Sequence, residues 1–567
     1  MKDLVHLEPA PVSGLAAEMK VRMRDGVHLA TDVYLPDGDD SPGDTILIRL
    51  PYDKSGSYTF IPLIAEYFMA RGYRVVAQDV RGKFRSEGRA LLFVNEVDDG
   101  RDTLDWLIRQ TWSNGRVAMW GDSYYGFTQW AAAASGHPAL KAISPRVTGT
   151  QLGEPVHADP RDRTRDVEQS VTNTYPLTHF FGRDTYLWDI DWTRRDFSDQ
   201  VEAFLERMRE RSPSYDQWVP HPVFLPRFPE GDPFAARSVP TLHTIGWWDN
   251  CAPLSWADVT RIEQHPAWAA HHHLRIEAMD HEGHFLNDDP ADRCDDLSDE
   301  QLRARLPRIL DPTLEFFEVF VRGRGNPDEI PRVIWNLAGT SQMRSEPAWP
   351  PSESRRVDLR AVGDGGLIVA SEATDSCGAG DRTAAPGAGA IEASWVHDPL
   401  DPVPSSVPDP FAYLLTHPDE APIGHRDDVL VFTSSPQSDD VDLAGPATAS
   451  ICLRSDGPVL DCFIRLLDLA PDGTAIRIAR GQRQLRDATR SETLSIDLGQ
   501  IGYRLRAGHR LRLHVCGSDY PEFLLQPGTG RDPWTEGVET IPNTHTALVG
   551  GEQGLSISLS VLSGEIG

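Results

Sequence analysis

The residues W-G-D-S-Y-Y-G (120–126) place Ser123 between two glycines, directly after the apolar run R-V-A-M (116–119). A serine in a tight turn between a buried strand and a helix can expose its hydroxyl as a nucleophile, usually with the spacing G-x-S-x-G. Here the second glycine, Gly126, stands one position later than that spacing requires. A serine between glycines is by itself more often part of an ordinary turn, so a catalytic role requires partners elsewhere in the chain.

A serine hydroxyl becomes a strong nucleophile when a histidine takes its proton and a carboxylate holds that histidine in the right tautomer. Asp249 follows the apolar run 239–248. His281 follows the run 273–278, so acid and histidine come after the serine in the order that such hydrolases use. Strands that end at one rim of a sheet would bring all three side chains together. His284 is the rival base, and Asp249 could instead cap a helix or pair with an arginine.

The negative charge that develops on the substrate oxygen needs hydrogen-bond donors, and removing one donor costs about 10² to 10³ in rate. The backbone N–H of Tyr124, the residue after Ser123, is one expected donor. Tyr52 lies in R-L-P-Y-D-K (49–54), just beyond the apolar run 45–50, and its phenol is the second. The other reading of Tyr52 is a packed aromatic ring at the entrance of a loop.

Short apolar runs and amphipathic stretches alternate in the segments that must position these residues. The expected strands are 45–50, 73–78, 116–120, 141–144, 239–249 and 273–281. The expected helices are 61–72, 96–110 and 127–134. This alternation predicts an α/β domain in which helices cover both faces of a parallel sheet. Before it, residues 19–35 alternate in polarity around Asp25-Gly26, which predicts a hairpin.

Residues 150–236 break this alternation. They are rich in Arg, Asp, Pro and aromatic residues, with one amphipathic helix at 200–211 and no strand runs. We therefore expect a helical cap inserted between two parts of one α/β core, 1–149 and 237–328. From 329 to 567, short alternating strands with turn signals predict an antiparallel β-sandwich.

The composition excludes several classes of partner. With 85 acidic and 55 basic residues among 567, the net charge is −30, so neither nucleic acid nor an anionic membrane is an expected partner. The six cysteines lack C-x-x-C spacing, so a zinc site is not expected and most should be reduced and buried. Neither a secretory signal nor a long apolar segment is evident, which predicts a cytoplasmic location.

The run His271-His272-His273 invites a metal interpretation. Consecutive residues of a strand point to opposite faces, so three adjacent histidines cannot bind one ion from regular structure. We expect a surface loop ahead of the strand instead.

Several motifs occur in a fixed order along the chain. They are P-Y-D-K (51–54), D-V-R-G-K-F-R-S-E-G (79–88), G-D-S-Y-Y-G (121–126), G-W-W-D (246–249), D-H (280–281), L-A-P-D-G (469–473) and A-G-H-R-L-R-L-H-V-C-G-S-D-Y-P (507–521). Together they resemble the cocaine-esterase-like (CocE/NonD) branch of the α/β-hydrolases, which is related to Xaa-Pro dipeptidyl-peptidases and α-amino-acid ester hydrolases. The resemblance covers nearly the whole chain.

This resemblance implies an α/β-hydrolase fold with a helical cap, followed by a C-terminal all-β jelly-roll domain. The family's serine turn is similar to G-x-S-Y-x-G, which matches the late Gly126. The implied site residues are the nucleophile Ser123, the acid Asp249, the base His281 and the oxyanion-hole donors Tyr52 and Tyr124. The segment E-A-M-D-H (277–281) departs from the family's G-P-W-x-H, which keeps His284 as the alternative base.

The expected function is hydrolysis of a small-molecule carboxylic ester through an acyl-enzyme, without a metal or organic cofactor. The runner-up is amide hydrolysis, by an acylase or an Xaa-Pro dipeptidyl-peptidase. Recognition of a free α-amino group requires carboxylates near the nucleophile, and the resembled α-amino-acid ester hydrolases carry acids just after the triad aspartate. This chain has N-C-A (250–252) there, which leaves Asp189 or Asp191 of the cap for that role.

An alternative from another class is a non-catalytic binding protein on a hydrolase scaffold. It predicts a damaged triad, and none of the three triad positions is damaged. Whether the chain forms a homo-oligomer is left open.

Overall fold

The computed structural model describes residues 5–6, 8–38, 41–154, 161–178, 185–186, 190–219, 223–283, 298–370, 390–407 and 417–567. The chain divides into two compact units. The first unit comprises residues 1–154, 173–190 and 203–335, and the second unit comprises 155–172, 191–202 and 336–567.

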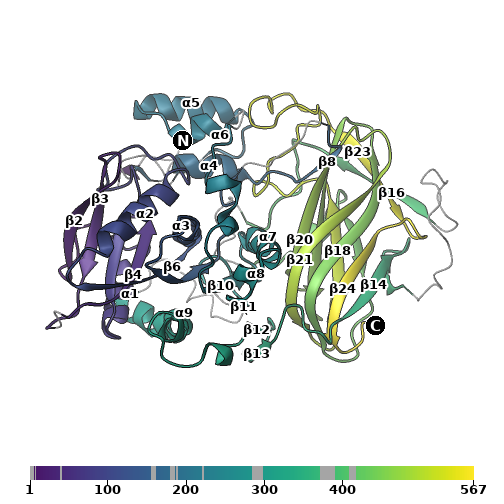
Figure 1. Cartoon of the computed structure of the whole chain (residues 1–567). Helices are drawn as coiled ribbons and strands as arrows, with labels where there is room; N and C mark the ends of the chain where they lie inside the picture. The colour runs from purple at the N-terminus through teal and green to yellow at the C-terminus, as the bar shows by residue number, and fades with distance from the viewer. Residues whose placement is uncertain are drawn as a thin grey trace. The chain divides into compact units, whose positions relative to one another are not determined.

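The first unit contains the alternating strands and helices (Figure 1). Its strands are β1 Val5–His6, β2 Ala16–Arg22, β3 His28–Tyr34, β4 Gly43–Leu50, β5 Arg74–Asp79, β6 Ser113–Asp122, β7 Leu140–Arg146, β9 Thr185–Tyr186, β10 Thr241–Gly246, β11 His272–Glu277 and β12 Val333–Asn336. Its helices are α1 Ile61–Met69, α2 Glu96–Leu107, α3 Ser123–Ala134, α6 Pro213–Trp218, α7 Ala252–Glu263, α8 Pro266–Ala269 and α9 Asp299–Phe320, with short 3₁₀ helices η1 Pro229–Gly231, η2 Pro233–Ala235 and η4 Pro327–Glu329. Helices α4 Ser170–Thr178 and α5 Phe197–Met208 each cross a boundary between the units.

The main sheet of the first unit is mixed. Its neighbouring strands follow the order β12–β11–β10–β7–β6–β4–β5–β3–β2. Neighbours from β12 to β5 run parallel, as expected from the apolar runs. The expected hairpin forms from β2 and β3, with Gly26 in its turn at φ +92°, but it also extends the sheet because β3 pairs antiparallel with β5. The expected parallel strands and the expected hairpin both form, and the hairpin gives the sheet an antiparallel edge.

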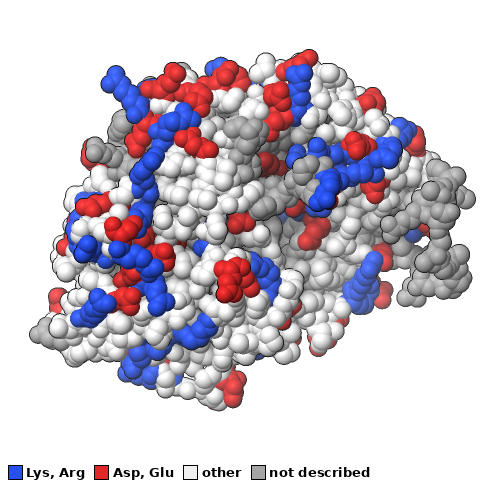
Figure 2. Space-filling view, turned by 45° about the horizontal axis from the view of Figure 1, so that its top comes forward, with Lys and Arg blue, Asp and Glu red and all other residues white. Residues whose placement is uncertain are grey.

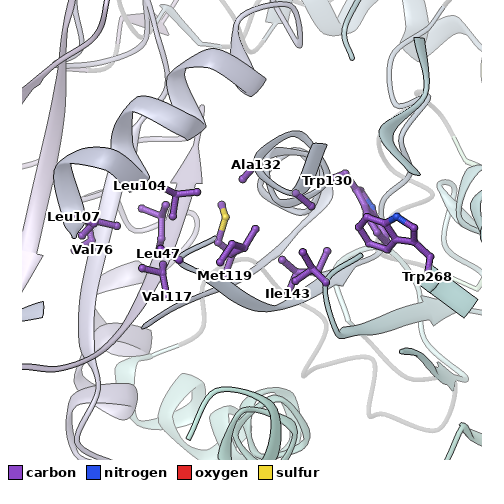
Figure 3. Packing of buried hydrophobic residues seen from close by; sticks show 14 of the residues in the cluster. Leu47, Val76, Leu104, Leu107, Val117, Met119, Trp130, Ala132, Ile143 and Trp268 are labelled. Carbon is purple, nitrogen blue, oxygen red and sulfur yellow. The ribbon is translucent and has the colours of Figure 1, made fainter. Parts of the chain in front are cut away.

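Helices cover both faces of this sheet (Figure 1). Helices α2 and α3 pack together on one face, and α1 and α9 pack together on the other. Figure 3 shows how strand residues such as Leu47 and Met119 pack against Leu104 of α2 and Ala132 of α3. Burial of apolar area of this kind contributes roughly 25 cal/mol per Å². The packed sheet therefore holds the loops at the carboxyl ends of its strands in fixed positions.

The second unit is built from two antiparallel sheets. The strands of these sheets are β8 Thr164–Arg165, β14 Arg355–Ala361, β15 Leu367–Val369, β16 Ile391–His397, β17 Leu430–Thr433, β18 Val441–Ser455, β19 Val459–Leu469, β20 Ala475–Arg486, β21 Glu492–Leu505, β22 Arg510–Cys516, β23 Asn543–Val549 and β24 Ser556–Ser563, with the 3₁₀ helix η6 Ala421–His425. Strand β13 Met343–Glu346 is part of neither sheet. One sheet has the order β15–β14–β24–β18–β23–β16 with β21 beside β18, and the other has the order β17–β22–β19–β20–β8. The expected antiparallel sandwich is confirmed.

The insertion 150–236 contains two strands that its sequence did not indicate. Strand β8 pairs antiparallel with β20, and β9 pairs antiparallel with β1. The expectation of no strands is therefore wrong here, because two-residue strands are too short to leave an alternating pattern. Residues 155–172 and 191–202 group with the second unit, and the remainder of the insertion after 172 groups with the first. The boundaries of a cap at 150–236 and of a sandwich from 329 stay a prediction.

Two residues of the histidine run, His272 and His273, begin β11, whereas His271 lies in the turn before it. His272 and His273 are buried, and only His271 is exposed. His272 Nε2 lies 3.4 Å from Nδ1 of His243, while His273 packs against Phe316 of α9. The two rings therefore point to opposite faces, as strand geometry requires, and the loop expectation is corrected for these two residues.

The remaining composition-based expectations concern cysteines and charge. The four described cysteines, at 251, 452, 462 and 516, are free and buried as expected, whereas Cys294 and Cys377 lie outside the described residues. Across the described part of the chain, every helix is too short or too polar to cross a bilayer. On the face drawn in Figure 2, acidic and basic side chains are interspersed.

Candidate active site

Ser123 stands at the junction of β6 and α3, with a left-handed backbone at φ +51°. A non-glycine residue adopts this conformation only where the surrounding structure enforces it, and such strain is common at functional sites. Two residues earlier, Gly121 has φ +154°, and a Cβ there would lie 2.1 Å from Cδ2 of Tyr125. The Tyr125 ring thus occupies the space that a side chain at position 121 would need.

The late glycine of the motif also has a steric cause. A Cβ at Gly126 would lie 2.6 Å from Cγ2 of Thr148 and 3.1 Å from the carbonyl oxygen of Arg146. Gly126 is in the first turn of α3, where the helix crosses the segment that follows β7. Only glycine fits where α3 crosses the segment after β7. The close packing of these two elements therefore explains why the second glycine of the motif is at position 126.

The structure brings the predicted acid and base together. Asp249 follows the end of β10 by three residues, and His281 follows the end of β11 by four. His281 Nδ1 lies 2.6 Å from Oδ1 of Asp249, and the backbone N–H of Cys251 donates to the same oxygen at 3.0 Å. The Asp249 side chain is fully buried and that of His281 is 11% exposed. An acid in this position fixes the tautomer that leaves Nε2 available to accept a proton.

The surroundings of His281 favour its protonated form. Burial opposes a charged imidazole, but Cys251 and Asp249 outweigh burial and raise the pKa of His281 well above its usual value. Burial together with Asp249 raises the pKa of the Cys251 thiol. The protonated imidazole is therefore favoured beside the Asp249 carboxylate.

Tyr52 is surrounded by the other candidate residues. Its hydroxyl lies 2.8 Å from the hydroxyl of Tyr175 in α4. Burial raises the pKa of Tyr52, while hydrogen bonds from Tyr175 and Ser123 and the charge of His281 oppose that rise. Tyr52 is therefore close to both the candidate nucleophile and the candidate base. Sequence reasoning missed Tyr175, because it lies in the aromatic-rich insertion, where no periodic pattern singles out one ring.

A buried cation fixes the loop that carries Tyr52. The Nζ atom of Lys54, whose side chain is 0% exposed, lies 3.0 Å from Glu18, 3.1 Å from Asp32 and 3.5 Å from Asp79. The backbone N–H of Lys54 also donates to Asp79 Oδ1 at 3.0 Å. The lysine of the P-Y-D-K motif thus ties the loop to β2, β3 and β5, two residues beyond the oxyanion candidate.

Tyr124 contributes a backbone N–H in the first turn of α3, directly after Ser123. The positive end of a helix dipole at this point favours a developing negative charge. Its side chain points elsewhere: the hydroxyl donates to Oε1 of Glu96 at 2.9 Å and accepts the Phe93 N–H at 2.9 Å. Glu96 is paired in turn with the buried Arg49 at 2.9 Å. The phenol of Tyr124 therefore holds the turn in place. The expected donor to the substrate oxygen is the backbone N–H of Tyr124, not its side chain.

Three ligand-type side chains meet beside the candidate base. Ligand atoms of Asp249, Cys251 and His281 lie within 4.8 Å of one another, a set that could hold a metal ion. The direct distance of 2.6 Å between Asp249 and His281 is shorter than the roughly 3.3 Å that separates two ligands on one tetrahedral ion. The arrangement in this structure is thus that of a hydrogen-bonded pair.

Of the three further candidates, His284 and Asp189 lie outside the described residues. Asp191 belongs to the second unit, where it is exposed and accepts hydrogen bonds from Thr193. The roles of Ser123, Asp249, His281, Tyr52 and Tyr124 stay predictions.

Solved structures with the same architecture identify the fold. An aminopeptidase from a marine-sediment Thaumarchaeota archaeon superposes with a TM-score of 0.77 at 20% identity, over 98% of this chain and 98% of that chain. An α-amino acid ester hydrolase superposes with a TM-score of 0.75 at 22% identity, over 97% of this chain and 98% of that chain. The protein is an α/β-hydrolase with a C-terminal β-domain, as the sequence motifs implied.

Sequence comparison gives the family. Residues 25–282 match the family of X-Pro dipeptidyl-peptidases (S15 family), and residues 326–557 match the X-Pro dipeptidyl-peptidase C-terminal non-catalytic domain. A cocaine esterase from Rhodococcus sp. (strain MB1 Bresler) is 28% identical over 91% of this chain and 93% of its own length. The chain belongs to the serine hydrolases of this family, the cocaine-esterase-like relatives of the X-Pro dipeptidyl-peptidases.

Proposed function

We propose that this serine hydrolase cleaves small-molecule carboxylic esters through an acyl-enzyme on Ser123. The proposal rests on residues from separate segments that lie close to Tyr52. The side chain of Ser123 forms a hydrogen bond with Tyr52, and the charge of His281 lowers the pKa of Tyr52. His281 is in turn held by Asp249 at 2.6 Å. An activated hydroxyl, a base with its acid and a phenol donor are the parts that acyl transfer requires.

Each side chain has a defined task in the proposed reaction. His281 Nε2 takes the Ser123 proton while Oγ forms a bond to the ester carbon, and the negative charge develops on the carbonyl oxygen. Tyr52 and the Tyr124 N–H donate to that oxygen. The bond to the leaving alcohol then breaks, and the imidazolium returns its proton to the alcohol oxygen. A water molecule repeats the sequence with the same base and releases the acid.

The charges near the nucleophile favour esters over substrates with a free amino group. Asp122, the residue before Ser123, is 27% exposed, but Arg146 Nε lies 2.8 Å from it. Burial raises the pKa of Asp122 although Arg146 opposes the rise, and the carboxylate is already paired with Arg146. The cocaine esterase that matches over nearly the full length is consistent with ester cleavage. Exposed Glu282, next to His281, is the acid that could serve an amino group instead.

A substrate panel tests the proposal. Purified protein should hydrolyse p-nitrophenyl esters of short and aromatic acids, and kcat/KM should exceed that for Xaa-Pro p-nitroanilides. Faster cleavage of the anilides, lost in Glu282→Gln, would establish the Xaa-Pro dipeptidyl-peptidase alternative that the family descriptions name. Activity on neither class would favour the binding-protein alternative.

A pair of variants decides the identity of the base. His281→Ala should lose about 10⁴-fold or more of the esterase kcat, whereas His284→Ala should lose little. The assignment fails if His284→Ala loses more activity than His281→Ala.

A further inference from the structure

The second unit contains a cavity of about 390 Å³ at one end of the strand pair β19 and β22. Its lining consists of Ala421, His425, Leu469, Ala470, Pro471, Gly473, Gly508, Arg510 and Arg512. This volume is within the range of small-molecule sites, about 300 to 1,000 Å³. None of the lining residues carries a carboxylate, in a chain whose acidic residues outnumber its basic ones by 85 to 55.

Strand register places the two arginines on one face. Arg510 and Arg512 alternate along β22 with the fully buried Leu511, which points the other way. Their cross-strand neighbours on β19 are Leu469 and Leu467, so the facing positions are apolar. Positions two apart on a strand are about 6.6 Å apart, a spacing from which two guanidinium groups can reach one ligand.

Neither guanidinium is neutralised within the described part of the chain. Arg510 Nη1 donates to the carbonyl oxygen of Ser434 at 2.9 Å, and Arg512 Nε donates to Oγ1 of Thr433 at 3.1 Å. Both acceptors are neutral oxygens. Burial and the like charge of Arg510 lower the pKa of Arg512. An anion bound here would relieve that repulsion.

Acids beside the cavity wall already have partners. Exposed Asp419 accepts the backbone N–H groups of Ala421 and Ala475, and exposed Asp472 accepts that of Thr474. Asp468 faces away from Arg510 and Arg512 on β19, and it binds His509 Nδ1 and the hydroxyl of Tyr503, each at 2.8 Å. Glu420, just before the cavity wall, is buried and lies 3.5 Å from Nη1 of the buried Arg465. These carboxylates are therefore held by other groups and do not compensate the two arginines.

A third basic side chain continues the same face of β22. His514 is fully buried, and neither of its ring nitrogens has a hydrogen-bond partner in the described part of the chain. Burial and the charges of Arg465, Arg512 and His425 lower the pKa of His514 to about 3. The protein thus keeps this histidine neutral beside the arginines, which limits the local positive charge but leaves that of Arg510 and Arg512 in place.

We propose that this cavity binds a small dianion, such as a phosphate group or a dicarboxylate, through Arg510 and Arg512, with His425 at the rim. Planar guanidinium forks match carboxylate and phosphate oxygens in pairs, which favours a ligand with two anionic oxygens over a monoanion. The site lies wholly within the second unit and is independent of the hydrolase activity proposed for the first.

Isothermal titration calorimetry at low ionic strength in a non-phosphate buffer tests the proposal. Inorganic phosphate and succinate are titrated separately into the intact protein, and we expect saturable binding of at least one of them. Tighter binding of phosphate would identify a phosphoryl site, and tighter binding of succinate a dicarboxylate site. Sodium acetate, a monoanion, should bind at least tenfold more weakly than the better dianion.

Variants distinguish specific binding of the dianion in this cavity from general electrostatic attraction to the protein surface. Arg510→Gln with Arg512→Gln should weaken binding at least tenfold, and the matched pair Arg510→Lys with Arg512→Lys should weaken it less, because charge remains while the fork is lost. Arg356→Gln with Arg490→Gln removes two exposed charges elsewhere in the unit and should leave affinity within twofold. The proposal is overturned if the wild type binds neither dianion at about 10 mM, or if the Arg356 and Arg490 pair weakens binding as much. Thermal melting confirms that each variant is folded.

Discussion

The ionisation of His281 sets when the proposed reaction can begin. Only a neutral imidazole can take the proton of Ser123. Burial lowers the pKa of His281, but Cys251 and Asp249 raise it well above the usual value of 6.5. The esterase kcat/KM should therefore rise with pH and reach half of its maximum above pH 6.5. A pH–rate profile on a p-nitrophenyl ester measures this midpoint.

A variant of Asp249, the acid paired with His281, is the matched control for the pH–rate profile. Asp249→Asn removes one of the charges that raise the pKa of His281, so the midpoint should move to lower pH. The same change should lower kcat about 10⁴-fold, because the tautomer of the base is no longer fixed. A wild-type midpoint at or below 6.5, or a midpoint that Asp249→Asn leaves in place, would contradict this electrostatic account.

The contact between Tyr52 and Tyr175 predicts coupled effects on catalysis. Tyr52→Phe should lower kcat by about 10² to 10³, the usual cost of one oxyanion donor. Tyr175→Phe should cost about tenfold. When Tyr52 donates to the substrate oxygen, the Tyr175 hydroxyl 2.8 Å away can donate to Tyr52 and strengthen that bond. In the Tyr52→Phe background, Tyr175→Phe should have almost no further effect on kcat. Fully additive losses would show that Tyr175 acts independently.

Among single residues, the sequence could indicate those candidates that directly follow strands. Ser123, Asp249 and Tyr52 could be selected because each comes just after an apolar run, and the structure places them in one unit. Tyr175 could not be selected, since its contact with Tyr52 spans 123 residues and no motif marks it. Side-chain contacts of this kind depend on tertiary packing, which local patterns do not contain.

Among the elements, the start of α3 is sterically constrained. Gly126→Ala would place a methyl group 2.6 Å from Thr148 Cγ2, and such overpacking costs about 1 to 3 kcal/mol. We expect a lower denaturation midpoint and a lower kcat, because the shift moves Ser123. Gly14→Ala, where the space within 4 Å is empty, should change stability by less than about 0.5 kcal/mol. Equal stabilities for the two variants would exclude a tight crossing.

Elements with a strong period were predicted from the sequence, and short elements were not. The runs that became β4, β5, β6 and β7 are buried on both faces, so their apolar character is continuous. Strand β8 has only two residues, and its partner β20 lies about 320 residues later, at Gln484 and Leu485. Pairing over that separation leaves no local signature, which is why the sequence of the insertion indicated one amphipathic helix and no strand.

At the scale of the whole molecule, each unit has its own buried core, which predicts separable unfolding. Ile48→Ala in β4 and Leu513→Ala in β22 each remove a fully buried side chain and should cost about 2 to 5 kcal/mol. Differential scanning calorimetry should show two transitions, with each variant lowering a different one. Esterase activity should disappear with the transition that Ile48→Ala lowers. A single transition lowered equally by both variants would contradict this.

The two-unit organisation was only partly predictable. Hydrophobic periodicity distinguished an α/β region from an all-β region, because helices and strands bury their faces at different periods. It could not assign residues 155–172 and 191–202 to the second unit, since these segments contain few strand-like residues. Their assignment comes from contacts within that unit, such as the hydrogen bond from Arg195 Nη1 to the Tyr520 hydroxyl at 3.0 Å.

Covalent labelling shows whether Ser123 is an activated nucleophile. A fluorophosphonate probe should modify the wild-type protein at one site per chain, and peptide mapping should place the label on Ser123. Ser123→Ala should remain unlabelled, and His281→Ala should label far more slowly, because the hydroxyl is then not activated. A wild-type protein that takes up no label, or a Ser123→Ala protein labelled to the same extent, would contradict the account.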